Sequence, residues 1–312
     1  MNKISFILFF LIICILSGYT QSINFNANNF LKNKVNNDYT YDTIIYHNDV
    51  IAIGNIKNNY KIDLWYFIDS TSNIYKKCFY YKDSIFVNCS IYNLKTDILI
   101  KKNRYKIVGD NNILFGRVLT YDKNKVLLHK YFVKNSNYEG LFYLYYNNGN
   151  IKEVNQVFNH KNNGVSIQFF IDGNILSIGK YKGDLKINKW TFYYKTAFIK
   201  KEGRYKQIKV SIDEYLTYNR NDIDYKGSIP EKDTITISVK DSIWVYYSNE
   251  GNLIKKEYYD SGKLIELKEY NSEEKLIKDE KYKEGKLLHL IEYDNKGEII
   301  KDEKYPPLPP EE

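Results

Sequence analysis

The sequence predicts an all-β protein, an elongated antiparallel β-meander built from tandem two-stranded repeats of about 23 to 24 residues. Composition is the first reason, because 32 Tyr and 16 Phe stand against only 5 Pro. Aromatic residues favour a pleated, half-buried surface, whereas Pro removes a hydrogen-bond donor from a β-ladder. A fixed period and recurring turn residues between the aromatic segments are the other two reasons.

The C-terminal array, residues 242–305, shows the period most clearly. Its segments 253–259, 276–282 and 299–305 are equally spaced and share, in the same order, an aliphatic pair, a Lys, a Glu and a Tyr. The strand that precedes each segment ends at Tyr247, Tyr270 or Tyr293. Each unit is therefore predicted to contribute two strands.

An upstream array, residues 138–206, has a slightly longer period of about 24 residues. Its recurring residues are, at the strand ends, Tyr146, Phe170 and Tyr194, and, at the start of the following strands, Ile151, Ile175 and Ile199. The segments 147–149 and 171–173 contain Asn, Asp or Gly, which accept the positive φ that a tight hairpin needs. They are predicted to be hairpin turns.

The remaining chain divides around these two arrays. Residues 46–137 look like a degenerate version of the same repeats. Residues 207–241 lose the period and contain Pro230, so they are predicted to be an irregular insertion or a worn repeat. Residues 23–45 form an Asn-rich N-terminal segment. Residues 306–312 form a Pro-rich tail, which either stops the last strand from pairing further or serves as a polyproline ligand.

One unit, residues 140–153, reads Gly-Leu-Phe-Tyr-Leu-Tyr-Tyr-Asn-Asn-Gly-Asn-Ile-Lys-Glu and resembles the MORN-repeat-variant family of bacterial antitoxin-like proteins. The match recurs in residues 188–194 and in the three C-terminal units, although the opening Gly is often absent and Lys-Thr-Ala follows Tyr194. The resemblance implies hairpin repeats, an antitoxin-like label, and the scaffolding and membrane association of the parent MORN repeats. Because the matching residues are those that make hairpins, they specify architecture rather than biochemistry.

Residues 1–22 have the features of a signal peptide. The apolar run 4–16 is shorter than the roughly 18 to 20 residues that a helix needs to cross a bilayer. No later segment is long and apolar enough to span a membrane, so we expect export to the periplasm, cell surface or medium. Lipidation of Cys14 is the alternative, although Ile13 is not the small residue that usually precedes a lipidated cysteine.

Two cysteines remain after signal removal, Cys78 and Cys89, and an exported chain meets an oxidising environment. A two-residue turn at 83–84 places Cys78 directly opposite Cys89, in a hydrogen-bonded pair with Cα atoms about 5.5 Å apart. This separation allows a disulfide, which we expect, with two buried free thiols as the alternative.

Residue types that carry catalysis or bind metals are not grouped in the sequence. The four histidines are far apart, and we find neither a nucleophile elbow nor a phosphate-binding loop. We therefore expect no enzymatic activity, no cofactor and no metal. The formal charge of +8 comes from Lys residues scattered singly among Asn and Tyr, so we expect no nucleic-acid partner.

Three acidic residues, Glu257, Glu280 and Glu303, recur at a fixed spacing. A ladder of carboxylates would suit a cation or acid–base chemistry. Each has a Lys within two residues, and solvated strand faces of alternating charge explain that pattern better.

The most distinctive candidate binding residues are the repeat aromatics, which are Tyr146, Phe170, Tyr194, Tyr247, Tyr270 and Tyr293. Stacked in one row they would add roughly 0.5 to 1.5 kcal/mol per favourable pair, so packing is their expected role. Rings that face solvent would instead suit a glycan or a partner protein.

The expected function is that of an exported binding or scaffold module at the cell envelope, with an unknown protein or polysaccharide as partner. The alternatives are a purely structural surface protein, an antitoxin-like protein and a hydrolase of envelope sugars. Contiguous exposed aromatics on one face would favour binding, an evenly polar surface the structural role, and a pocket with two close carboxylates the hydrolase.

Overall fold

The computed structural model describes residues 43–47, 50–57, 60–69, 71–80, 86–108, 111–218, 222–224 and 233–306. The expected signal peptide with Cys14, nearly all of the N-terminal segment and the tail beyond Pro306 lie outside these residues. Within the described ranges, no helix combines the length and the apolar character that a membrane span requires.

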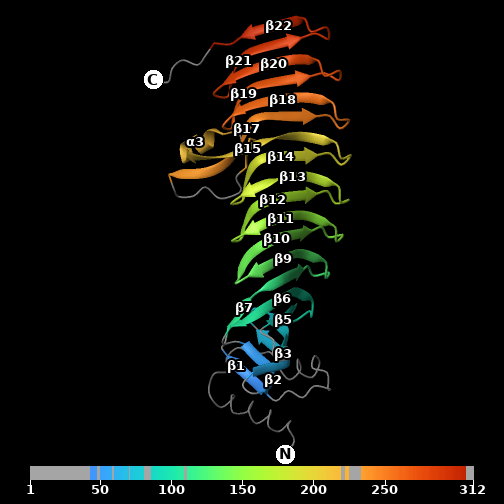
Figure 1. Cartoon of the computed structure of the whole chain (residues 1–312), viewed down its shortest axis with the longest axis vertical. Coiled ribbons are helices and arrows are strands. Elements are labelled where there is room, and N and C mark those ends of the chain that lie inside the picture. Colours follow the sequence, from blue (N-terminus) through green and yellow to red (C-terminus); the bar gives the residue numbers. More distant parts are fainter. Residues whose placement is uncertain are drawn as a thin grey trace, which may run out of the picture. The chain divides into compact units, whose positions relative to one another are not determined.

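The described elements are almost all antiparallel strands that pair in chain order, which confirms the predicted β-meander (Figure 1). The chain divides into two compact units. The first comprises residues 1–113 and 123–125, and the second comprises residues 114–122 and 126–312.

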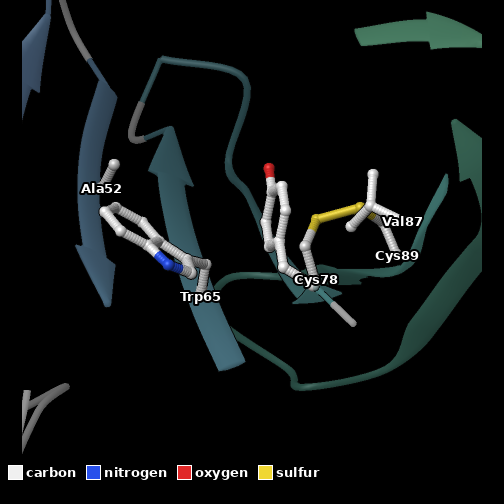
Figure 2. Close-up of a cluster of buried hydrophobic side chains, with 6 residues drawn as sticks. Ala52, Trp65, Cys78, Val87 and Cys89 are labelled. Atoms are coloured by element: carbon white, nitrogen blue, oxygen red, sulfur yellow. A yellow bond between two sulfur atoms is a disulfide. The ribbon is translucent and has the colours of Figure 1, made fainter. Parts of the chain in front are cut away.

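The first unit contains a meander whose strands are β1 (Thr43–His47), β2 (Val50–Lys57), β3 (Tyr60–Asp69), β4 (Ile74–Tyr80), β5 (Phe86–Asn93) and β6 (Leu99–Val108). The next strand, β7 (Asn111–Leu114), ends at the boundary between the units. Figure 2 shows the core of this unit, where Trp65 lies against Ala52 on the neighbouring strand.

Cys78 and Cys89 are direct partners across β4 and β5, and a disulfide joins them inside this core (Figure 2). Their Cα atoms are 4.1 Å apart, close to the about 4.5 Å of a non-hydrogen-bonded pair. The expected hydrogen-bonded type of pair is therefore wrong. The two-residue turn at 83–84, from which that pairing is predicted, lies outside the described residues.

The second unit is a longer meander, in which successive hairpins follow one another from green to red in Figure 1. Its strands before the insertion are β8 (Gly116–Tyr121), β9 (Leu127–Lys134), β10 (Asn137–Tyr145), β11 (Ile151–Phe158), β12 (Lys161–Phe169), β13 (Ile175–Lys182), β14 (Leu185–Tyr193) and β15 (Ile199–Ser211). After it follow β17 (Thr234–Tyr247), β18 (Leu253–Asp260), β19 (Lys263–Tyr270), β20 (Leu276–Lys283), β21 (Lys286–Tyr293) and β22 (Ile299–Lys304).

Two kinds of turn alternate along this unit. Tight turns have two residues with positive φ, such as Asn159 at 48° and His160 at 64°, which is the twist that a two-residue hairpin favours. The wider turns close with a backbone hydrogen bond such as that from Gly149 N to Tyr146 O, 2.9 Å long. The predicted Asn-Gly turns are of this wider kind, and Gly149 has a φ of 86°.

A left-handed residue kinks most of the strands that enter a wider turn. Gly140 in β10, the residue that opens the family-like unit, has a φ of 88°, and Asn188 in β14 and Ser242 in β17 have φ values of 58° and 60°. Asn tolerates this region better than most residues other than Gly. The opening Gly therefore marks a backbone kink that other residues also adopt, which explains why it is often missing.

The segment predicted as an irregular insertion or worn repeat, residues 207–241, is regular in its described part. It lengthens β15 and β17 and adds the short helix α3 (Ile212–Thr217), which Figure 1 shows beside the sheet, and the two-residue strand β16 (Ile223–Asp224). The helix begins where the Ser211 hydroxyl accepts a 3.1 Å hydrogen bond from Glu214 N. A small core of its own holds the segment, with Tyr215 and Ile237 fully buried.

Candidate functional site

All three tryptophans occupy the same kind of site, fully buried against a glycine of the preceding strand. The pairs are Gly54 with Trp65, Gly179 with Trp190, and Gly203 with Trp244, and a Cβ on any of these glycines would overlap the indole ring. The indole N–H donates to the carbonyl of the residue after the glycine, at 3.0 Å in the first pair and 3.1 Å in the other two. Each glycine is thus required by a ring that lies directly on the backbone.

A lysine and a second ring accompany each tryptophan. The lysine lies four residues before it and the ring two residues after it, as in Lys186, Trp190 and Phe192. The Nζ of Lys186 lies 4.9 Å from the Trp190 ring centroid, and that of Lys61 lies 5.1 Å from that of Trp65. Such cation–π contacts let a half-buried ammonium group cover an apolar core. We call the sheet face that carries Trp190 and Trp244 the tryptophan face.

The six predicted aromatics do not form one row, so that part of the prediction is wrong. Tyr247, Tyr270 and Tyr293 are the last paired residues of their strands, opposite Leu253, Leu276 and Ile299. The corresponding residues of the first array are Tyr145, Phe169 and Tyr193. Tyr146, Phe170 and Tyr194 lie one residue further on and begin the turns. Adjacent strand residues point to opposite faces, so the two sets are distinct.

All six of these side chains are half-buried, and the turn set braces neighbouring repeats. The Tyr146 hydroxyl donates to Phe169 O at 2.7 Å, and the Tyr194 hydroxyl donates to Tyr247 O at 3.0 Å. Lys152 and Lys200 lie over the rings of Tyr146 and Tyr194, at 5.7 Å and 5.4 Å. These contacts give the turn set a role in holding one hairpin against the next.

The three recurring glutamates lie on the tryptophan face. Glu257 and Glu280 are 7% and 8% exposed, so the predicted solvated strand face is wrong for both. Glu257 pairs directly with Trp244 across the sheet, in the same way that Gly203 pairs with Trp190. Glu280 lies in the equivalent place one repeat later. Glu280 is bound by Lys278 Nζ at 2.8 Å and by the Tyr282 hydroxyl at 2.7 Å. The sequence suggested solvent exposure because Lys278 and Tyr282 alternate with Glu280 along the strand. Both side chains lie on the same face as Glu280 and cover it.

The most concentrated group of polar side chains surrounds Lys240, where the insertion meets the sheet. Lys240 Nζ lies 2.8 Å from Asp222 Oδ1, 3.2 Å from Glu257 Oε2, 3.1 Å from the Tyr246 hydroxyl and 3.0 Å from the Tyr259 hydroxyl. We call these five residues the Lys240 cluster. Lys255 Nζ adds a second ion pair with Glu257, 2.6 Å from Oε1. Sequence reasoning missed Lys240 and Asp222 because they belong to the segment without a period.

Neighbouring side chains determine the protonation states of Glu257, Tyr246 and Tyr259 in the Lys240 cluster. Burial alone raises the pKa of Glu257, but hydrogen bonds from Lys255 and Tyr246 and the charge of Lys240 outweigh it and hold that pKa at about 2. Burial and the carboxylates raise the pKa of Tyr246 and Tyr259 far above the usual range. At neutral pH the cluster therefore contains an ionised glutamate and neutral tyrosines.

Acid is expected to weaken the protein through Glu257. A carboxyl group whose pKa is lower in the folded than in the unfolded state stabilises the fold above its unfolded pKa, here about 4.5, and stops doing so as the pH falls towards 2. The Glu257→Gln variant should therefore lose less stability than the natural chain between pH 4.5 and 2. Urea unfolding at several pH values measures this difference. The same pH dependence in both proteins would contradict the prediction, and Glu250→Gln, on an exposed turn, is the control.

The Lys240 cluster contains two carboxylates, Asp222 and Glu257. A hollow in the second unit has a volume of about 410 Å³ and is lined mainly by polar and basic residues, among them Lys182, Arg204 and Lys206. Neither Asp222 nor Glu257 contributes to it. Both carboxylates are instead engaged by Lys240, at 2.8 Å for Asp222 and 3.2 Å for Glu257.

Among the described residues, no group of three His, Cys, Asp or Glu side chains is placed to hold a metal ion. The histidines have separate partners, since His129 bonds to Thr120, His160 to Asn137 and His289 to Asp302. His47 lies in β1, where the side chains are not described.

Comparison with known proteins gives no family. No family profile and no curated protein matches the chain. Two solved structures, entitled "Crystal Structure of TcdB2-TccC3" and "Crystal Structure of TcdB2-TccC3-TEV", are similar over 82% and 83% of this chain, with identities of 9% and 8%. The chain spans 18% of the length of each, and the TM-scores are 0.17 and 0.14. Likeness at this level carries neither fold nor function to this protein.

Proposed function

We propose that the chain is an exported, non-enzymatic binding module of the MORN-variant kind that docks a partner protein at the cell envelope. Four exposed apolar side chains on consecutive strands of the second unit carry this proposal: Phe132 in β9, Leu141 in β10, Phe158 in β11 and Val165 in β12. Their exposures are 42%, 50%, 52% and 43%. We call them the apolar face. Exposed apolar groups gathered on neighbouring strands mark interaction surfaces more often than isolated ones do.

The alternation of burial supports placing these residues on one side of the sheet. Phe132 lies between Tyr131 and Val133, which are both buried, and the buried residues Val157 and Ser166 adjoin Phe158 and Val165. Since successive strand residues point to opposite faces, the exposed side chains point away from the tryptophan face. Leu141 pairs with Gln156, whose two strand neighbours are buried.

The fold does not require apolar residues at these positions. One or two repeats further along, the equivalent residues are Lys180 for Phe132, Lys182 for Phe158, and Lys189 for both Leu141 and Val165. All three lysines are exposed. An apolar patch that other repeats replace by charge is better explained by binding than by packing.

Export is supported by the predicted signal peptide and by the Cys78–Cys89 disulfide, because disulfides persist mainly in oxidising compartments. The same disulfide argues against a cytoplasmic antitoxin. A purely structural surface protein is the second candidate, and it is favoured by the buried contacts that join each repeat to the next.

The test substitutes lysine at all four positions, as Phe132→Lys, Leu141→Lys, Phe158→Lys and Val165→Lys. Because lysine already occupies equivalent positions, we expect an unchanged circular dichroism spectrum and a melting temperature close to that of the natural chain. In pull-downs from envelope extracts the natural mature chain should retain a defined protein that the quadruple variant loses.

A single substitution provides the matched control. Ile243 lies in β17 at the position equivalent to Leu141 and is 46% exposed, but it is outside the apolar face. Ile243→Lys should retain the partner, whereas Leu141→Lys should weaken its capture. Equal capture by the natural chain and the quadruple variant would refute docking through this face and would favour the structural candidate.

A further inference from the structure

Lys240 and Asp222 are held together by backbone as well as by side chains. The Lys240 amide donates to Asp222 O at 2.9 Å, which fixes the two residues beside each other where the insertion returns to the sheet. Their side chains meet at 2.8 Å, with exposed fractions of only 7% for Lys240 and 13% for Asp222. Glu257, whose side chain is 9% exposed, completes the group. A buried amine thus lies against one carboxylate while a second carboxylate contacts it from another strand.

We propose that Lys240 and Asp222 condense to form an isopeptide bond, which ties the insertion covalently to β17. The amine nitrogen Nζ is the nucleophile and the Asp222 carboxyl carbon Cγ is its target. Glu257 and Tyr259 carry the protons. This inference does not depend on the proposed binding function.

The reaction balances without any added reagent. An ammonium group and a carboxylate give an amide and one water molecule, so the Nζ–Cγ bond forms and one Cγ–Oδ bond breaks. Two of the ammonium protons leave with that oxygen as water, and the third remains on the amide nitrogen. Nothing is oxidised or reduced.

The hydrogen bonds supply a route for these protons. Glu257 Oε2 is 3.2 Å from Nζ and accepts the proton that must leave before nitrogen can attack. The Tyr259 hydroxyl is 3.0 Å from Glu257 Oε2 and 3.0 Å from Asp222 Oδ1, so it connects the acceptor to the oxygen that departs. Lys255 remains bound to the other oxygen of Glu257 at 2.6 Å and balances its charge throughout.

The surroundings favour the amide over the ion pair. Lys240 Nζ lies 5.3 Å from the Trp244 ring centroid, 5.9 Å from that of Tyr246 and 4.8 Å from that of Tyr259. Keeping two charges among such rings requires their desolvation, whereas a neutral amide avoids it. Nucleophilic attack is also easier for an amine that has lost its water shell.

A second ion pair in the same sheet serves as an internal control. Lys278 and Glu280 are also 2.8 Å apart, but the Lys278 side chain is 30% exposed. Glu280 occupies the position of Glu257 one repeat later. The Lys278–Glu280 pair should remain unlinked. This result would show that a short contact alone is not enough, and that the buried arrangement around Lys240 is needed for condensation.

The experiment is mass spectrometry of the exported chain after reduction of its disulfide. We expect an intact mass lower than that of the mature sequence by one water molecule. Trypsin should release peptide 221–226, which contains Asp222, joined to peptide 233–255, which contains an uncut Lys240. Residues 276–283 should appear as unlinked products cut after Lys278 and Lys281. A folded chain with the full mass, or a link that maps to Glu257, would overturn the proposal.

Three variants separate the chemistry from folding. Lys240→Arg keeps the positive charge and Asp222→Ala removes the target, so both should have the full mass. Glu257→Gln keeps both reacting groups and should react at least tenfold more slowly, as followed by the mass of freshly refolded protein. If Lys240→Arg fails to fold, Glu257→Gln still decides the matter, because a water loss as fast as that of the natural chain would overturn the role of Glu257.

Discussion

Replacing Trp190 by alanine is expected to lower the free energy of unfolding of the second unit by about 3 to 5 kcal/mol. The ring is fully buried and contacts Tyr181 and Tyr205 edge-on, with centroids 5.1 Å and 6.5 Å away. Its N–H donates a hydrogen bond to the Lys180 carbonyl. The substitution leaves a cavity and an unpaired backbone acceptor in the buried cluster that Trp190 shares with Tyr181 and Tyr205. Urea unfolding followed by circular dichroism measures the loss.

Two further variants test the reason for this effect. Phe158→Ala removes an exposed ring from the same unit and should change the unfolding free energy by no more than about 0.5 kcal/mol. Gly179→Ala places a methyl group in the volume of the Trp190 ring, so it should destabilise the natural chain much more than the Trp190→Ala variant. Equal effects of Gly179→Ala in both backgrounds would show that the indole does not require the glycine.

Removing the disulfide by the double substitution Cys78→Ser and Cys89→Ser is expected to destabilise the first unit by about 2 to 4 kcal/mol. The bond closes a loop between residues separated by 11 positions and lies in the core beside Val87. Its loss frees the unfolded chain and places two hydroxyl groups in an apolar site. Hydrogen exchange in β4 and β5 should accelerate accordingly.

The second unit provides the reference for this measurement. Exchange in β20 and β21 should be the same with and without the disulfide, since neighbouring hairpins stabilise one another only locally. Unchanged exchange in β4 and β5 would mean that the rest of this core holds the hairpin without the bond.

Sequence patterns predicted the hairpins because turns and strand ends are local features. The periods of the two arrays, the Gly149 turn and the opposition of Cys78 to Cys89 all follow from counting along the chain. The predicted alignment of the repeat aromatics is displaced by one residue between Tyr194 and Tyr247. A register shift precedes the last pair at Tyr193 and at Tyr247, and the insertion between them interrupts the period from which the frame is counted.

Burial was harder to predict than topology. Glu257 looks solvated because two lysines precede it in the sequence, yet Lys255 lies on the same face and forms an ion pair with its buried carboxylate. The glycines beneath the tryptophans went unnoticed because strand ends, not rings, had set the alignment. Placing the three tryptophans in register would have found the recurring lysine and the second ring that accompany each of them.

The insertion between β15 and β17 has a consequence for how this protein can change. The indole-to-carbonyl hydrogen bond spans 10 residues at Trp65 and Trp190 but 40 at Trp244, and the tyrosine brace spans 23 residues at Tyr146 but 53 at Tyr194. Both contacts survive the same lengthening with unaltered partners. We therefore expect a tight turn such as 183–184 to accept an inserted foreign peptide without disturbing the pairing of the sheet that displays it.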